Sequence, residues 1–251
     1  MRQSLQDRLF SPNPVVRLAA ANAKPSKLAP FLPRSWIVNA FGAANAWVVA
    51  VGPSPGTGPG GKVDRAVPPV LGTVHPQFRH FLDNDPKGFW NELFRLLREG
   101  FRHAEVARKD KDAALKLTMA MNLLTNPQGD ASQLTPEMLK KGLPRLSRVL
   151  RVTRPRIILA LTKVVYKVIH EWWSDRFGGV GPDLQHPVPT KKKDGGTKTY
   201  DGRSRWLGRD NQHSILLVKM LQHPSKANSY SGNEAIVSAY VEERIAAAIT
   251  G

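Results

Sequence analysis

The run Trp47-Val48-Val49-Ala50-Val51 leads directly into the turn Gly52-Pro53-Ser54-Pro55-Gly56. An uninterrupted apolar run of this length is typical of a strand that is buried on both faces of a parallel sheet. A second run, Ile215-Leu216-Leu217-Val218, is followed by Gln222-His223-Pro224-Ser225. The two runs predict buried strands that each end in a turn with one polar side chain. We expect the two turns to contribute a hydroxyl and an imidazole to one pocket.

Two further strands are predicted between these runs, over 115–121 and 156–161. Segments with helical spacing of apolar residues alternate with the strands, at 85–101, 135–152, 163–176 and 232–249. Such alternation predicts an α/β fold, a three-layer α/β/α sandwich with a mainly parallel four-stranded sheet. Ligands of such sheets bind at the carboxyl ends of the strands, where we expect Ser54, Asn122 and His223.

The rest of the chain divides into an extension and an insertion. Residues 1–45 are expected to form a helical extension, which includes a helix that starts at Asn13-Pro14 and a short helix over 35–44. Residues 46–251 then form the main α/β domain, with a basic polar insertion at about 178–213. Two other segments lack a clear pattern, and we expect ordered loop at 62–84 and a charged, solvated stretch at 104–114.

Composition narrows the classes of function. Lys and Arg number 37 against 20 Asp and Glu, so the formal net charge is +17, which favours a polyanionic partner, with DNA as the first candidate. An acidic protein or a membrane surface is the alternative. The chain has no cysteine, which excludes disulfides, thiolate metal sites and cysteine nucleophiles.

The sequence gives no sign of a membrane segment or a signal peptide. No apolar run approaches the ~20 residues that span a bilayer, and Met1 to Arg8 lack the apolar core of a signal peptide. We therefore expect an intracellular, cytoplasmic monomer that makes no membrane contact, nucleoid-associated if the chain is bacterial. The histidines do not cluster with carboxylates at metal-ligand spacing, so we expect no metal and no cofactor.

Several motifs together resemble the uracil-DNA glycosylase superfamily over roughly residues 46–248. Gly52-Pro53-Ser54-Pro55-Gly56 resembles the first signature of that superfamily, and His223-Pro224-Ser225 resembles its His-Pro-Ser loop. Three stretches between them are similar to superfamily members in the same order: Phe89-Trp90 to the mismatch-specific type, Met121-Asn122-Leu123-Leu124 to the single-strand-selective and thermostable types, and Arg154–Lys163 to the Pro-(Lys/Arg)-x-Ile-x-x-Leu-Gly-Lys stretch. Ser54 stands where the superfamily has Asp or Asn, and Thr162 where it has Gly.

The resemblance implies a catalytic pair. Cleavage of an N-glycosidic bond produces a departing anionic base, and His223 would donate a hydrogen bond to the base oxygen as that charge develops. Ser54 would position the attacking water by hydrogen bonding. It would not act as the general base, because a hydroxyl does not take up a proton at neutral pH. The alternatives are that His223 only caps its strand end and that Ser54 is structural.

Base binding is implied for a second set of residues. Asn122 offers a donor and an acceptor to a pyrimidine edge, and Phe81, or else Phe78, would stack on the extruded base. Gly52 and Gly56 would let the backbone approach the base or a phosphate closely, and Pro53 beside Gly52 belongs to the base-binding set as well. The sequence leaves open that Asn122 only satisfies its own turn, that the phenylalanine belongs to the core, and that the Gly/Pro loop binds no ligand.

Two segments are candidates for DNA contact. In the superfamily the loop after the His-Pro-Ser motif enters the duplex beside the extruded base, and the basic insertion could follow phosphates, where Trp206 could stack on a base. The residues are Lys226, Asn228, Ser229 and Tyr230 in the loop and Lys191, Lys192 and Lys193 in the insertion. Solvated segments without a partner are the alternative for both.

The sequence thus predicts a monofunctional DNA glycosylase that removes a damaged pyrimidine, with uracil as the first candidate, and leaves an abasic site. Two alternatives stay open. One is a DNA-binding protein that keeps the fold without catalysis, motivated by Ser54, and the other is a glycosylase for another modified base.

Overall fold

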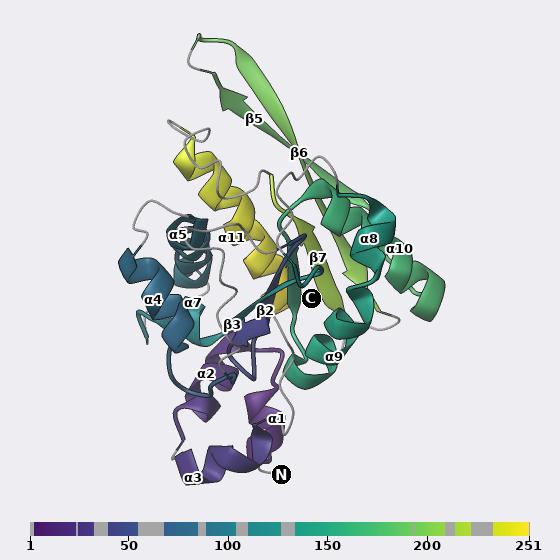
Figure 1. The fold of residues 1–251 in the computed structure, drawn as a ribbon. Helices are drawn as coiled ribbons and strands as arrows, with labels where there is room; N and C mark the ends of the chain where they lie inside the picture. The colour runs from purple at the N-terminus through teal and green to yellow at the C-terminus, as the bar shows by residue number, and fades with distance from the viewer. Residues whose placement is uncertain are drawn as a thin grey trace.

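The computed structural model contains one mixed β-sheet with helices against both faces (Figure 1). The residues that it describes are 3–23, 25–32, 40–54, 68–84, 89–103, 110–126, 134–192, 194–208, 214–221 and 233–250. Over these ranges the strands are β1 (Ala40–Gly42), β2 (Val48–Gly52), β3 (Thr118–Asn122), β4 (Ile157–Ala160), β5 (Leu184–Lys191), β6 (Thr197–Leu207) and β7 (Ile215–Lys219). Their order across the sheet is β1-β3-β2-β4-β7-β6-β5.

The centre of the sheet consists of the predicted strands, and they are parallel. β2 pairs with β3 from Val48↔Thr118 to Gly52↔Asn122 and pairs with β4 on its other side, and β4 pairs with β7. Every residue of β2, β4 and β7 is buried, which explains why the sequence shows uninterrupted apolar runs there. The predicted α/β class is therefore confirmed.

The predicted four-stranded sheet is wrong, because the described residues form seven strands, of which β1, β5 and β6 pair only with antiparallel neighbours. At one edge β1 pairs antiparallel with β3, in place of the final part of the helix predicted over 35–44. Gly42 has a φ of +125°, and a Cβ there would overlap the Thr118 carbonyl, so this position fits a strand packed closely on β3 and not a helix. Residues before Ala46 thus contribute to the sheet itself.

At the other edge, the predicted insertion supplies β5 and β6. β6 pairs antiparallel with β7 from Arg203↔Lys219 to Leu207↔Ile215, and β5 pairs with β6. The inward positions of this hairpin include Thr190, Gly202 and Ser204, which are buried but not apolar. The sequence therefore lacks the alternation of apolar and polar residues by which a half-buried strand is recognised.

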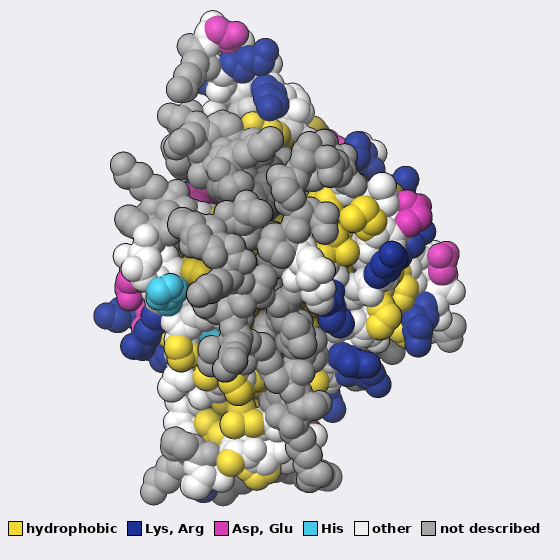
Figure 2. All heavy atoms as spheres, viewed as in Figure 1, with side chains coloured by type: hydrophobic (Ala, Val, Ile, Leu, Met, Phe, Trp, Pro, Cys, Tyr) yellow, Lys and Arg dark blue, Asp and Glu magenta, His cyan; other side chains and the backbone are white. Residues whose placement is uncertain are grey.

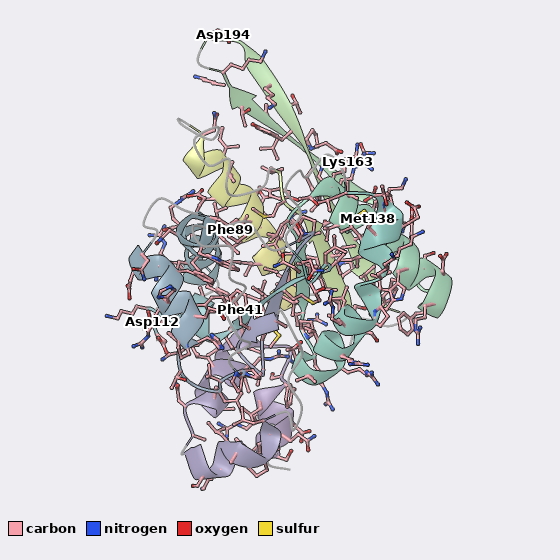
Figure 3. The ribbon with its side chains drawn as sticks, viewed as in Figure 1. Phe41, Phe89, Asp112, Met138, Lys163 and Asp194 are labelled. Atoms are coloured by element: carbon pink, nitrogen blue, oxygen red, sulfur yellow. The ribbon has the colours of Figure 1, made fainter. Side chains whose placement is uncertain are left out.

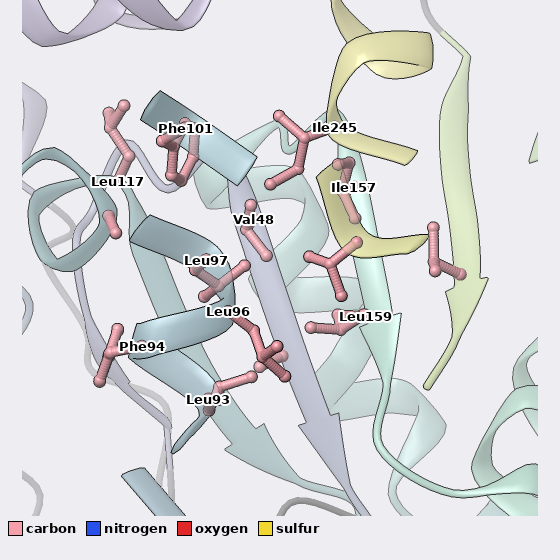
Figure 4. Packing of buried hydrophobic residues seen from close by; sticks show 14 of the residues in the cluster. Val48, Leu93, Phe94, Leu96, Leu97, Phe101, Leu117, Ile157, Leu159 and Ile245 are labelled. Atoms are coloured by element: carbon pink, nitrogen blue, oxygen red, sulfur yellow. The ribbon is translucent and has the colours of Figure 1, made fainter. Parts of the chain in front are cut away.

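The helices complete the two outer layers. They are α1 (Leu5–Leu9), α2 (Pro14–Ala21), α3 (Pro25–Leu28), α4 (Pro76–Asn84), α5 (Phe89–His103), α7 (Ala113–Lys116), α8 (Pro136–Lys140), α9 (Leu143–Thr153), α10 (Lys163–Phe177) and α11 (Glu234–Thr250), with a 3-10 turn at Ala29–Phe31. Val48 and Ala50 of β2 face α5 and α11, whereas Val49 and Val51 face α9 and α10. Figure 4 shows Leu97 and Ile245 against Val48 and Ile157 on the first of these faces. Among the described helices, none combines the length and the apolar character that crossing a membrane requires.

Three predicted segments differ from the structure. The expected loop at 62–84 contains α4, which is held by an aromatic cluster in which the Phe78 ring lies 4.7 Å from that of Phe94. The helix predicted over 135–152 is divided into α8 and α9 at Lys141 and Gly142, and a Cβ on Gly142 would overlap the backbone of Leu123. Ala113 and Ala114, expected to be solvated, are buried in α7, so β3 begins only at Thr118.

A buried arginine joins the N-terminal helices to the amino ends of the central strands. The Arg17 side chain on α2 is 1% exposed, and its guanidinium donates hydrogen bonds of 2.7 to 3.2 Å to backbone carbonyls only. The acceptors belong to Phe10, Ser11, Asn45, Ala46, Thr153 and Arg154. Burial, and then the charges of Arg156 and Arg154, lower the pKa of Arg17 to about 9, so it remains protonated at neutral pH.

Replacement of this guanidinium should be strongly destabilising. We expect Arg17→Met, which keeps much of the side-chain volume, to lower the free energy of unfolding by about 3–5 kcal/mol, because it leaves buried carbonyls without donors. Chemical denaturation measures the loss. Arg151→Met, at an exposed position on α9, is the matched control and should change stability by about 0.5 kcal/mol or less. An unchanged denaturation midpoint for Arg17→Met would contradict this role.

A histidine connects the hairpin to α11. His186 on β5 has its Nε2 2.8 Å from the Ser204 Oγ, and the Arg244 Nη1 on α11 lies 3.0 Å from its Nδ1. Burial, and then the positive charge of Arg244, lower the pKa of His186 below its ordinary value of 6.5. The ring is therefore neutral in the folded chain at neutral pH.

This arrangement predicts a loss of stability in acid. Because the folded chain binds the His186 proton more weakly than the unfolded chain, the contribution of the ring is present above about pH 6.5 and is lost as the pH falls through the lowered pKa. Denaturation series between pH 7 and pH 5 should therefore show a smaller decrease for His186→Asn than for the original chain. His80→Asn, at an exposed position on α4, should retain the original decrease, and equal decreases in all three proteins would refute the assignment.

Candidate functional site

The carboxyl edge of the central strands is the natural place for a site in this topology. β3 lies on one side of β2 and β4 on the other, so the order of the strands reverses between β2 and β4. Crossovers that leave in opposite directions open a crevice at the carboxyl ends of such strands. The residues at this edge are Gly52 on β2, Asn122 on β3, Ala160 on β4 and Lys219 on β7.

The structure brings the front turn and the predicted Asn together. Gly52 and Asn122 are register partners, and beyond them the amide of Leu124 donates to the Pro53 carbonyl at 2.9 Å. A Cβ on Gly52 would overlap the Asn122 Oδ1, so the amide lies directly against the glycine backbone. Ser54 follows Pro53 at the same edge and is partly exposed. Gly52, Pro53, Ser54 and Asn122 thus form one group, as predicted.

The Asn122 amide is available for a ligand. Its side chain is partly exposed, and no hydrogen bond joins it to any other residue within the described ranges. Its backbone turn is satisfied without it, because the amide of Leu123 donates to the Gly52 carbonyl at 3.0 Å. The alternative, in which Asn122 only satisfies its own turn, is therefore not what this part of the structure shows. Its amide can offer one donor pair and one acceptor to a planar edge.

The starts of α5, α9 and α10 all lie at this edge. α10 follows β4 directly, and the Thr162 Oγ1 caps it by accepting a hydrogen bond of 3.3 Å from the Val165 amide. Figure 3 places Phe89, at the start of α5, on one side of the sheet and Lys163, at the start of α10, on the other. Because helix starts carry partial positive charge, this edge favours anions. Thr162, at the place where the resemblance has Gly, thus acts as a helix cap.

A buried lysine adds to the positive charge. Lys219 ends β7 beside Ala160 and is 6% exposed, and its Nζ lies 3.4 Å from the Asp201 Oδ2. Burial lowers the pKa of Lys219, and the carboxylate of Asp201 opposes that shift, whereas Arg203 and Lys163 reinforce it. Sequence reasoning missed Lys219. The signal that could have marked it is a single Lys at the end of an apolar run.

Arg145 on α9 also reaches this edge. Its Nη2 donates to the carbonyl of Leu123, directly after β3, and its Nε is buried without a hydrogen-bond partner. Burial lowers the pKa of Arg145. The close packing of α9 against the end of β3 depends on Gly142, because a Cβ at this position would overlap the backbone of Leu123. Nothing in the sequence marked Arg145, because its position depends on how α9 packs on β3.

Comparison with protein-family models and with curated protein sequences finds no match. The chemistry of the edge must therefore be deduced from its own residues. Among the described side chains, no three His, Asp or Glu residues come together in a way that could hold a metal ion. The described residues at this edge include the Asn122 amide, the hydroxyls of Ser54 and Thr162, and several cations.

The predicted stacking residue lies in an aromatic cluster. The ring of Phe81 on α4 is stacked on Trp90, with centroids 5.4 Å apart and planes 7° apart, and Phe41 meets it edge-on. One face of Phe81 is therefore covered, and the side chain is only partly buried. The second choice, Phe78, is fully buried in the core, so it has the structural role that was the alternative.

Several predicted site residues lie outside the described ranges. These are His223, Lys226, Asn228, Ser229 and Tyr230 from the back turn and its loop, and Lys193 from the insertion. Their proposed roles stay predictions. Lys191 and Lys192 are described and exposed, at the end of β5 and just beyond it.

A double-mutant cycle can test the contact between Gly52 and Asn122. The methyl group of Gly52→Ala would overlap the Asn122 amide, and we expect a cost of about 1–3 kcal/mol in the free energy of unfolding. Because Asn122→Ala removes the overlapping group, the double variant should be about 1 kcal/mol more stable than the sum of the single changes predicts. Chemical denaturation of the four proteins gives this coupling. Additive changes would show that the amide does not lie against Gly52.

Proposed function

We propose that the chain is a DNA glycosylase that cleaves the N-glycosidic bond of a damaged pyrimidine, with uracil as the first substrate. The observation that carries the proposal is the Asn122 amide, which has no hydrogen-bond partner in the described ranges and lies against Gly52 at the strand-order reversal. A donor and an acceptor on one side chain match the O4 acceptor and N3–H donor of uracil. The same pair is presented in the opposite sense by cytosine, so one amide orientation discriminates between them.

The surroundings of Asn122 are suited to a departing anion. When the bond between C1′ and N1 breaks, its electron pair leaves with the base, and the negative charge spreads onto the base oxygens. The start of α10, together with Lys163 and Lys219, gives this edge positive charge. That positive charge stabilises the negative charge as it develops on the leaving base. His223 is the proposed direct donor to the base.

Water must then add to C1′ and lose a proton, which the departed base anion or bulk water accepts. The Ser54 hydroxyl can orient this water through a hydrogen bond but does not take the proton at neutral pH. A step that relies on orientation without a general base should be slow relative to one that has a carboxylate. The proposal therefore includes a modest rate and a small effect of Ser54 substitution.

The net charge of +17 supports a DNA substrate. A polyanion is attracted to such a chain over long range, and phosphate contacts hold it while the base is extruded into the site. No cofactor is required, because hydrolysis consumes only water.

The test is release of uracil from an oligonucleotide, detected as strand scission after alkali. We expect scission on single- or double-stranded substrate, reduced about 10²-fold by Asn122→Ala because the leaving base loses its paired hydrogen bonds. Ser54→Ala should reduce the rate about tenfold, the equivalent of one hydrogen bond. Asn84→Ala, an exposed Asn on α4, is the control and should keep the full rate.

Two outcomes would replace the proposal. Scission no greater than that of Asn122→Ala, together with retained salt-sensitive binding, would indicate the catalytically inactive DNA-binding protein that Ser54 first suggested. Scission only with hypoxanthine, hydroxymethyluracil or mismatched thymine in the same oligonucleotide would keep the reaction and change the base.

A further inference from the structure

The β5–β6 hairpin projects beyond the carboxyl edge of the sheet. The last pair between β6 and β7 is Arg203↔Lys219, yet β5 and β6 continue for six more pairs, from His186↔Gly202 to Lys191↔Thr197. We call residues 186–202 the arm. At about 3.4 Å per pair it extends roughly 20 Å. Figure 1 shows it as the two-stranded ribbon that leaves the body of the molecule at the top of the view.

The arm is braced on one face only. Val188 and Thr190 are buried, and Tyr200 packs against the core that α11 covers. At the far end, Asn233 just before α11 bonds the Lys191 backbone twice, with Oδ1 accepting from its amide and Nδ2 donating to its carbonyl, both at 2.9 Å. The other face carries Pro187, Pro189, Lys191, Thr197, Thr199 and Asp201, all exposed. The arm is thus held in position while one side of it remains open.

The acidic residues of the arm are engaged by nearby groups, and among its described lysines Lys198 has its Nζ 4.5 Å from the centroid of the Tyr200 ring. The Asp194 Oδ1 accepts from the Gly196 amide at 2.9 Å, and Asp201 pairs with Arg203 at 2.8 Å and with Lys219 at 3.4 Å. Lys191, Lys192 and Lys198 are exposed, and none of them pairs with a carboxylate in the described part of the chain. Figure 2 shows dark blue side chains on the arm beside one acidic residue at its tip, which Figure 3 labels Asp194.

The chemistry of the arm favours one kind of partner. Pro187 and Pro189 stand on the outer strand of the sheet, where they remove backbone donors and so prevent another strand from adding. Its exposed side chains in the described ranges include no large apolar residue that would enter a membrane. They also include no Asn, Gln or Arg at the tip that would read base edges. Lysines and threonine hydroxyls remain, and these bind phosphate oxygens.

We infer that the arm lies along the phosphate backbone of the nucleic acid strand that occupies the carboxyl edge, and holds it without regard to sequence. The inference takes its partner, a nucleic acid, from the proposed function, and it does not depend on any catalytic step. The length of the arm, roughly 20 Å, corresponds to about six nucleotides of one strand in a B-form duplex, at about 3.4 Å each. The contacts should therefore fall on one flank of the target nucleotide, about six nucleotides long.

The salt dependence of binding tests the inference with a duplex of thymidine and deoxyadenosine oligonucleotides, which contains no uracil. The variant is Lys191→Gln, Lys192→Gln and Lys198→Gln combined, and the control is Lys27→Gln, Arg148→Gln and Arg151→Gln, three exposed cations on α3 and α9. Both variants lower the net charge by the same amount. At about 0.9 per phosphate contact on B-form DNA, we expect the slope of log Kd against log salt to fall by about 3 for the arm variant and by much less for the control.

Two further measurements sharpen the result. Replacement of the same three lysines by Arg should restore the slope, because positive charge is retained. Extension of one flank by six nucleotides should raise the affinity of the original chain and not that of the arm variant. Thermal unfolding of the variants is expected to match the original chain, since the replaced side chains are exposed.

Equal slopes for the arm variant and the control, or no measurable binding, would overturn the inference. Equally strong arm-dependent binding to polyglutamate or to phosphatidylserine vesicles would overturn it in favour of an acidic protein or a membrane. Arm-dependent binding without uracil release would instead contradict the proposed function and leave the role of the arm intact.

Discussion

The amino ends of the central strands are fixed by one buried guanidinium. Arg17 takes its acceptors from the chain around α1, from the turn before β2 and from the end of α9, just before β4. Because these carbonyls come from segments far apart in the chain, a single side chain ties together the segments that precede β2 and β4, two strands that also pair with each other. The Arg17 contacts thus support the amino ends of β2 and β4, whereas the register of β2 on β3 sets Gly52 against Asn122 at the opposite edge.

Sequence reasoning predicted the strands whose side chains are buried on both faces of the sheet. The runs at β2, β4 and β7 have apolar side chains on both faces, and short runs of this kind bounded by turn residues are typical of central parallel strands. It was not successful for β1, which has three residues, or for β5 and β6, where small or polar residues such as Thr190, Gly202 and Ser204 stand at inward positions. Such strands are stabilised by pairing with a neighbour distant in sequence, which local periodicity does not report.

The candidate site likewise contains residues that the sequence predicted and residues that it did not. Gly52, Ser54 and Asn122 were predicted to meet because each follows an apolar run, and the structure places them at one edge. Arg145 and the buried position of Lys219 were missed, because the first depends on the packing of α9 and the second on the cover that α10 and β6 provide. Phe81 was expected to present a free ring, yet its stacking on Trp90 depends on α4, a helix that the sequence did not predict.

The arm has a geometric property that the rest of the sheet lacks. Its pairs beyond Arg203 support no other strand, so residues inserted at the turn between Lys192 and Gly196 would lengthen it without changing the register of β6 on β7. Each added pair would extend it by about 3.4 Å. The length of the arm can therefore change in evolution independently of the α/β core. The bonds of Asn233 to Lys191 mark the point beyond which any added pairs would extend the arm.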